Sequence, residues 1–205
     1  MSYLKKYQWQ LIPKDLPMVR RNCPKCNEKA RYINSEKFRV NANKNSIDIW
    51  LIYQCEKCKS TWNMAVYERV KPHDINKYEY EKFLSNDKEL VREYAFNLSM
   101  YNKNKTEVIL EDIDYELIQK KSKAYYSNEN ELIIEIACKY LIELRVDKLL
   151  SDKLGISRSK IKNMNKEGLI FIKDNKSSLN IKVKDRIEIH VLNIAENIEI
   201  LEAIE

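Results

Sequence analysis

Four of the five cysteines stand in two Cys-x-x-Cys pairs, Cys23-Pro-Lys-Cys26 and Cys55-Glu-Lys-Cys58. Each pair fits a tight turn that directs two sulfurs at one point. Zinc prefers four soft ligands at tetrahedral corners, and two such turns supply them. Turn amides can also donate to the thiolates and spread their negative charge. The spacing therefore predicts one zinc ion held by Cys23, Cys26, Cys55 and Cys58.

Other chemistry fits these cysteines less well. A redox Cys-x-x-Cys motif is expected beside a thioredoxin-like βαβ pattern, which the sequence lacks. An iron–sulfur cluster also takes four thiolates, but the usual ferredoxin spacings are absent. A catalytic zinc keeps one position open for water, whereas four cysteines close the shell. We therefore expect a structural zinc ion, and we expect Cys138 to be a small buried hydrophobe.

The composition excludes several classes of catalytic site. The chain has 205 residues, and its only glycines are Gly155 and Gly168. Rossmann and Walker phosphate loops need several glycines for close backbone approach, so neither is possible here. The two histidines, His73 and His190, have no evident nucleophile as a partner. We therefore expect a protein without enzymatic activity.

Charge and hydropathy suggest where the protein works and what it binds. The formal net charge is +6, which raises the expectation of an anionic partner such as nucleic acid. No apolar run suits a signal peptide or a membrane span. The sequence thus favours a cytoplasmic protein that does not enter a membrane. In that reducing compartment, cysteines bind metal more often than they form disulfides.

The expected fold class is α+β, beginning with an antiparallel zinc ribbon over residues 1–70. Residues 1–20 resemble a lead-in with two prolines. Strands are predicted at 37–40, 47–53 and 64–67, so that two hairpins each present one cysteine turn. Aromatic residues in this region alternate with basic ones and could stack on bases. We favour the interpretation that the aromatic residues form the ribbon's small core. The aromatic residues are Phe38, Trp50, Tyr53 and Trp62, and the basic ones are Arg31, Arg39, Lys44 and Lys59.

Residues 71–130 are predicted to form a helical connector. The run Asn86-Asp-Lys-Glu89 has a capping pattern, and apolar residues follow it at helical spacing. A second, weaker helix is expected from Asp114 to Tyr125. Its basic run, residues 119–123, is interpreted as a solvated helix face.

Residues 131–195 are predicted to form a small α/β module, followed by an acidic tail at 196–205. A strand is expected at 131–139 because its apolar residues alternate. Two short helices follow from Leu144, with Ser157 capping the second and Gly168 ending it. Strands are then expected at 169–172 and 179–191.

This module resembles the small RNA-binding domain first seen in ribosomal protein S-four. The resemblance lies in Leu144-Arg-Val-Asp-Lys-Leu-Leu150, Gly155-Ile-Ser-Arg-Ser159 and Gly168-Leu-Ile170. Lys184 stands where that family usually has glycine, which puts the geometry of one turn in doubt. The resemblance implies contact with structured RNA, such as ribosomal or transfer RNA, through a basic helix pair. The contact residues it suggests are Arg145, Arg158 and Lys162, and the charge of the helix pair adds Lys148 and Lys160.

The charges of the helix pair agree with that expectation. Seven basic residues and three acidic ones leave an excess of four positive charges, which suits a phosphate backbone. Asp147 is expected to orient or cap groups locally. Three alternatives remain open: a module that has lost RNA binding, an accessory to RNA modification or processing, and a DNA-binding regulator or protein-interaction adaptor with a structural zinc ribbon.

The whole chain also resembles a bacterial family of unknown function, the one numbered 1062. The residues that carry this resemblance are Ser35-Glu-Lys-Phe-Arg-Val-Asn-Ala-Asn43, Asp48-Ile-Trp-Leu-Ile-Tyr-Gln-Cys55, Thr61-Trp-Asn63 and Glu68-Arg69. This family brings no activity with it.

Overall fold

The structure is a computed structural model that describes residues 4–43, 45–111, 113–124, 131–173 and 178–193, together with 200 and 203. The chain divides into two compact units. Asp15–Glu111 form the first, which we call the cysteine unit. Met1–Lys14 and Asp112–Glu205 form the second, which we call the composite unit because it joins both ends of the chain. The expected divisions lay near residues 70, 130 and 195, whereas the structure divides the chain after 14 and after 111.

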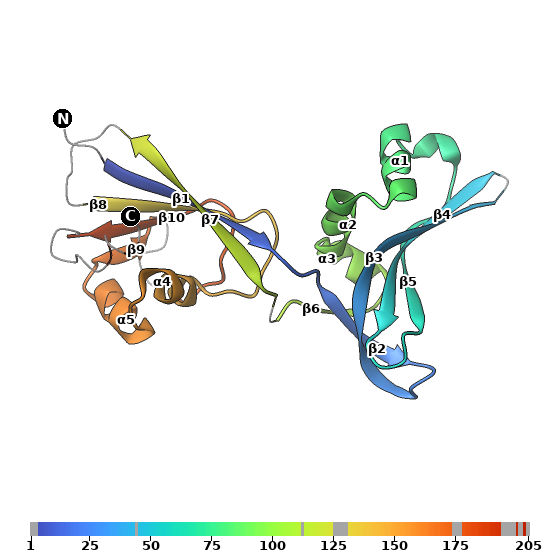
Figure 1. Ribbon diagram of the computed structural model, residues 1–205, viewed down its shortest axis with the longest axis horizontal. Coiled ribbons are helices and arrows are strands. Elements are labelled where there is room, and N and C mark those ends of the chain that lie inside the picture. The colour runs from blue at the N-terminus through green and yellow to red at the C-terminus, as the bar shows by residue number, and fades with distance from the viewer. Residues whose placement is uncertain are drawn as a thin grey trace. The chain divides into compact units, whose positions relative to one another are not determined.

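The cysteine unit is built on an antiparallel sheet with the strand order β5-β4-β3-β2-β6 (Figure 1). Its strands are β2 (Met18–Cys23), β3 (Glu28–Asn43), β4 (Ser46–Cys55), β5 (Thr61–Val70) and β6 (Glu107–Ile109). These contain the three strands expected in this region. Along β4 every second residue from Ile47 to Cys55 is buried, so one face of the sheet forms the core.

Three short helices cover that buried face: α1 (Lys77–Ser85), α2 (Lys88–Ala95) and α3 (Leu98–Lys103), after the 3-10 turn η1 (Pro72–Asp74). Phe83 of α1 meets Phe38 of β3 edge to face, with ring centroids 4.8 Å apart. The N-cap of α2 is Asp87, one residue later than the capping pattern suggested. Asn86 instead ends α1 in the left-handed conformation, and its side chain accepts a hydrogen bond from the Phe38 amide.

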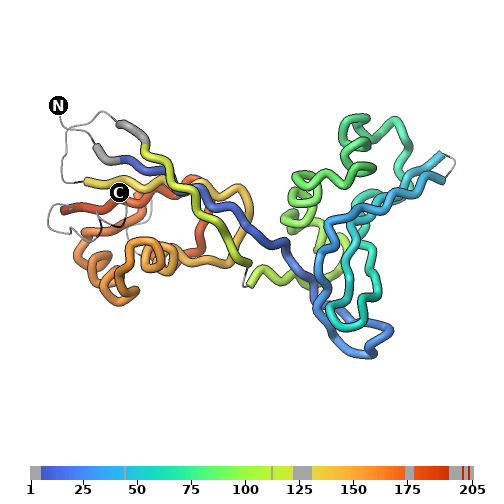
Figure 2. Tube along the Cα trace, viewed as in Figure 1, coloured from blue at the N-terminus to red at the C-terminus, as the bar shows by residue number. Residues whose placement is uncertain are grey.

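The composite unit contains a mixed sheet with the order β7-β1-β8-β10-β9. Its strands are β1 (Leu4–Pro13), β7 (Tyr115–Ala124), β8 (Glu131–Ala137), β9 (Ile170–Ile172) and β10 (Ile187–Leu192). β1 is parallel to β8 and antiparallel to β7. Figure 2 shows this N-terminal strand in blue among the strands of the C-terminal part of the chain.

Two expectations for this unit were wrong. The supposed lead-in is an interior strand, β1, between β7 and β8: Tyr7, Trp9 and Leu11 alternate with polar residues, and all three are buried. The supposed helix at 114–125 is the edge strand β7, whose Leu117 packs against the core. Its lysine run protects an exposed sheet edge from further pairing, which is a common use of lysine.

Helices α4 (Val146–Leu154) and α5 (Arg158–Lys166) cover one face of this sheet (Figure 1), and both were expected. Ser157 caps α5 by accepting from the Lys160 amide at 3.2 Å. The strand expected at 179–191 begins only at Ile187, because residues 179–183 pair instead with the start of α4. The acidic tail lies outside the described residues except for 200 and 203, and Ile200 is buried in the core. No helix in the described part of the chain is long and apolar enough to cross a membrane.

Candidate functional site

The four paired cysteines lie at two matching turns of the cysteine unit. Cys23 ends β2 and Cys55 ends β4, while Cys26 and Cys58 lie in the turns that follow. In the first turn the amide of the residue after the pair donates to Cys23 O at 2.8 Å, and in the second to Cys55 O at 3.0 Å. The donating residues, Asn27 and Lys59, both have a positive φ. Both pairs thus use the same backbone geometry.

The two turns bring the four sulfurs together. Cys23 Sγ lies 3.5 Å from Cys58 Sγ, and Cys26 Sγ lies 3.9 Å from Cys55 Sγ. All four sulfurs lie within 4.8 Å of one another. A tetrahedral metal with bonds of about 2.3 Å to sulfur requires edges of about 3.8 Å. The cluster therefore fits one metal ion with four thiolate ligands, and it is the one such group found among the described residues.

Ser60 lies beside this cluster and favours thiolates within it. Its hydroxyl is 3.0 Å from Cys58 Sγ and 3.4 Å from Cys23 Sγ. Hydrogen bonds from Ser60, and then from Tyr32, lower the pKa of Cys23 to about 5. The contact with Ser60 also lowers the pKa of Cys58. Ser60 therefore helps to prepare two of the four sulfurs as metal ligands, since a metal binds the thiolate form.

The aromatic residues near the cysteines divide between the two faces of the sheet. Tyr53 is fully buried, and its ring lies 5.6 Å from that of Trp62. Phe38 packs on α1 as described above. Trp50 points to the other face of β4, where its register partner on β3 is Arg39. Lys44 lies outside the described residues. Three of the four aromatics thus serve the core, as favoured from the sequence.

The basic residues singled out on the helix pair all reach the surface of the composite unit. Lys148, Arg158, Lys160 and Lys162 are exposed, and the Arg145 side chain is 38% exposed. The structure brings Arg145 and Arg158 together although they are 13 positions apart (158 − 145). Their spacing in the sequence does not predict this proximity, because the two arginines meet through a third residue that contacts both.

That residue is Asp147, whose side chain is only 1% exposed. Arg145 donates to it twice, from Nε to Oδ1 at 3.0 Å and from Nη2 to Oδ2 at 2.7 Å. Arg158 Nη2 donates to the same Oδ2 at 3.0 Å. Desolvation would raise the pKa of Asp147, but the hydrogen bonds from Arg145 and Arg158 outweigh it and lower that pKa. Asp147 is therefore an ionised buried carboxylate that pairs with both guanidinium groups, whereas the sequence predicted only that it would orient or cap groups locally.

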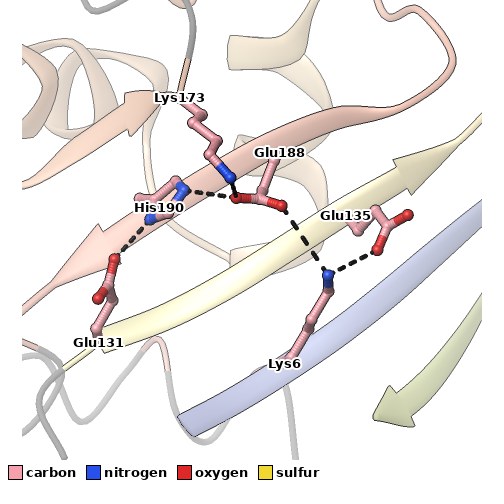
Figure 3. A network of polar contacts seen from close by, with 6 residues as sticks. All are labelled: Lys6, Glu131, Glu135, Lys173, Glu188 and His190. Atoms are coloured by element: carbon pink, nitrogen blue, oxygen red, sulfur yellow. Dashed lines mark hydrogen bonds and ion pairs between the residues drawn. The ribbon is translucent and has the colours of Figure 1, made fainter. Parts of the chain in front are cut away.

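A polar network that the sequence did not reveal lies on the sheet of the composite unit, on the face opposite to α4 and α5 (Figure 3). His190 contacts Glu131 through Nδ1 at 2.5 Å and Glu188 through Nε2 at 3.0 Å. Its ring stacks on Phe171 at 5.1 Å. Glu188 also meets Lys173 at 2.9 Å, and Lys6 on β1 pairs with Glu135 at 2.9 Å. The alternation of polar residues along β8 and β10 was the available signal, but their cross-strand partners depend on topology.

These features define an α+β chain with one four-cysteine cluster that could hold a metal ion and one buried carboxylate that joins two arginines. The chain belongs to the family described as Protein of unknown function (DUF1062), whose model matches residues 40–176. The matched segment includes Cys55, Cys58 and both helices of the basic pair, and it begins after Cys23 and Cys26. Searches of curated proteins and of solved structures gave no significant match.

Proposed function

We propose that this chain is a non-enzymatic RNA-binding protein whose cysteine unit is built around one structural zinc ion. The observation that carries the RNA proposal is the pair of guanidinium groups oriented by Asp147 at the surface of α4 and α5. Guanidinium groups match the geometry of phosphate oxygens, and their charge is independent of pH in the physiological range.

The zinc part of the proposal rests on the cysteine set. Four thiolates at tetrahedral spacing are the usual ligands of structural zinc, and they leave no position for a reacting water. The ion would connect the two hairpins, β2–β3 and β4–β5, at the ends where their strands stop. We therefore assign the zinc a role in folding and none in chemistry.

The RNA part rests on the distribution of charge over the helix pair. The apolar residues of α4 and α5 are buried against the sheet, which leaves the basic residues on the outer surface. Phosphate and 2′-hydroxyl contacts dominate the recognition of structured RNA, so a surface of oriented arginines and exposed lysines suits it. The likeness to the RNA-binding domain of ribosomal protein S-four supports the same proposal.

A titration of the zinc-loaded protein with a fluorescein-labelled RNA hairpin tests this proposal. We expect the double variant Arg158→Glu/Lys162→Glu to weaken binding at least tenfold. We also expect it to flatten the dependence of log K on log salt by roughly 0.7–0.9 for each lost phosphate contact. Both side chains are exposed, but Arg158 also pairs with the buried Asp147, so a thermal unfolding curve must show that the double variant is still folded.

The matched control is Lys77→Glu/Lys88→Glu, which makes the same change of charge at two exposed positions of the cysteine unit. It should weaken binding much less than the first variant. Equal losses would show that net charge alone matters and would remove the site assignment. Tighter binding to duplex DNA than to RNA at the same salt concentration would favour a DNA-binding regulator instead.

A further inference from the structure

Asp147 is the most deeply buried charged side chain among the described residues, and it lies under a surface proposed to bind an anion. An acid is an unexpected choice for this position if the surface serves only to accumulate positive charge. Burying a carboxylate is also costly unless it is paired and hydrogen-bonded. Its location therefore calls for a specific role.

The two arginines keep most of their hydrogen-bonding capacity while Asp147 holds them. A guanidinium has five N–H donors. Arg145 uses two of them on Asp147, which leaves three (5 − 2), and Arg158 uses one, which leaves four (5 − 1). Their side chains are 38% and 45% exposed, so donors remain available to solvent. Two cations on one carboxylate also leave a net charge of +1.

The backbone beneath this pair is held from both sides. The amides of Val146 and Asp147 donate to the carbonyls of Ile181 and Leu179, at 2.9 and 3.1 Å. The Val183 amide donates to Leu144 O at 2.7 Å. The start of α4 is thereby fixed to the segment that precedes β10, and its first two amides are not free to bind an anion. The side chains of Arg145 and Arg158 are therefore the main donors available to an anion at this place.

We propose that Asp147 is a positioning residue that holds Arg145 and Arg158 as a fork for a single phosphate group of bound RNA. This inference rests on the proposed function and names the chemical group that the site takes. Asp147 does not touch the phosphate. It reduces the conformational freedom of two long side chains before binding, and this lowers the entropic cost of forming the contact.

The substitution Asp147→Asn separates this proposal from simple electrostatics. Removing a negative charge from a basic surface should strengthen RNA binding if only net charge matters. If Asp147 positions the fork, the same substitution should weaken binding by about tenfold, the effect of roughly one lost charge-assisted hydrogen bond. The measurement is the anisotropy titration of the full chain with the labelled RNA hairpin.

Asp152→Asn is the matched control, because Asp152 lies exposed on the same helix and the change of charge is identical. It should bind RNA as tightly as the unaltered chain or slightly more tightly. If Asp147→Asn binds as tightly as Asp152→Asn, the positioning role is wrong.

Two further measurements keep the outcome decisive. If Asp147→Asn fails to fold, the variant Arg145→Lys/Arg158→Lys keeps both charges and removes the planar fork, and we expect it to bind several-fold more weakly.

In addition, inorganic phosphate should shift the guanidinium NMR signals of Arg145 and Arg158, but not that of Arg39. RNA binding without this shift would overturn the fork alone. The shift without RNA binding would overturn the proposed function and leave a phosphate site.

Discussion

The cysteine cluster and the arginine pair both join two segments at one point, but they do so by different means. The cysteine turns are two copies of one local motif, each with the same backbone hydrogen bond and the same positive φ. The arginine pair depends on a single carboxylate, Asp147, that contacts both partners. In the cysteine cluster, the side chains that would bind the metal also define the geometry of the site. In the arginine pair, the geometry is defined by Asp147, which need not touch the bound molecule.

This difference has a consequence for stability. If the cysteine unit binds zinc as proposed, its thiolates gain their largest interaction from that ion, and folding and metal binding are coupled there. The composite unit contains no comparable cluster among its described residues, and its stability comes from a sheet in which one interior strand, β1, is supplied by the N-terminal part of the chain. The two units should therefore respond to different perturbations.

Metal removal should produce the largest difference in stability between the two units. Zinc bound to four cysteines contributes about 10–16 kcal/mol of apparent binding free energy at neutral pH. We expect a strong chelator, or the substitution Cys58→Ser, to unfold the sheet of the cysteine unit and leave the composite unit folded. Hydrogen exchange should show lost protection at 18–70 and retained protection at 131–137 and 187–192.

Cys138→Ser is the control for this experiment, because Cys138 is buried in the core of the composite unit and is not a member of the cluster. It should leave one zinc ion per chain by metal analysis. Unchanged exchange at 18–70 after complete metal removal would disprove the coupling of folding and metal binding. Iron in place of zinc in the purified protein would disprove the assignment of the metal.

Loss of the indole of Trp9 should have the next largest effect, and it should fall on the other unit. Trp9 is 1% exposed on the interior strand β1, and its Nε1 donates to Gln119 Oε1 at 2.7 Å. Trp9→Ala should destabilise the composite unit by about 3–5 kcal/mol in denaturant unfolding. Gln10→Ala alters the opposite face of the same strand and should cost about 0.5 kcal/mol or less. Similar losses for both variants would mean that β1 is not a core strand.

The two sites also differ in how far the sequence predicts them. The cysteine cluster was predictable because its ligands lie three residues apart in each pair, and the turn that such spacing favours is local. The helices α4 and α5, with the Ser157 cap, were predictable for the same reason. The place of each strand in the sheet was not predictable from the sequence. The composite sheet pairs residues 4–13 with residues 115–124, and only the topology decides which distant strand is the partner.

The errors have physical causes that can be named. Pro13 and Pro17 suggested an irregular lead-in, although the alternation around Trp9 is typical of a strand. The basic run at 119–123 fits a solvated helix face and a protected edge strand equally well. The sequence singled out Arg145 and Arg158 by their charge and by resemblance. Their convergence on Asp147 depends on how α4 and α5 pack, which no local pattern specifies.

The smallest expected effect concerns pH and the network of Figure 3. Desolvation would raise the pKa of Glu188, but hydrogen bonds and charge from Lys173 and His190 outweigh it and lower that pKa. A carboxyl whose pKa is lower in the folded state stabilises the fold above its unfolded pKa. This contribution is lost as the pH falls through the folded pKa. The composite unit should therefore lose stability in acid, below about pH 4.5, where a free glutamate begins to take up its proton.

The substitution Glu188→Gln tests this effect without a contribution from the cysteine unit. At pH 7 it should lower stability by about 1 kcal/mol, the typical net effect of a partly exposed charge-assisted hydrogen bond. That corresponds to a decrease of about 4 °C in the midpoint of thermal unfolding for a unit of this size. The decrease should become smaller as the pH falls below 4.5 toward the lowered pKa, because Glu188 then loses its charge in the unaltered chain as well. Glu116→Gln, at an exposed position on β7, should show no such change with pH. The opposite result would be a difference in stability between Glu188→Gln and the unaltered chain that stays the same from pH 7 to pH 3. That result would show that the network stabilises the composite unit through packing and not through the charge of Glu188.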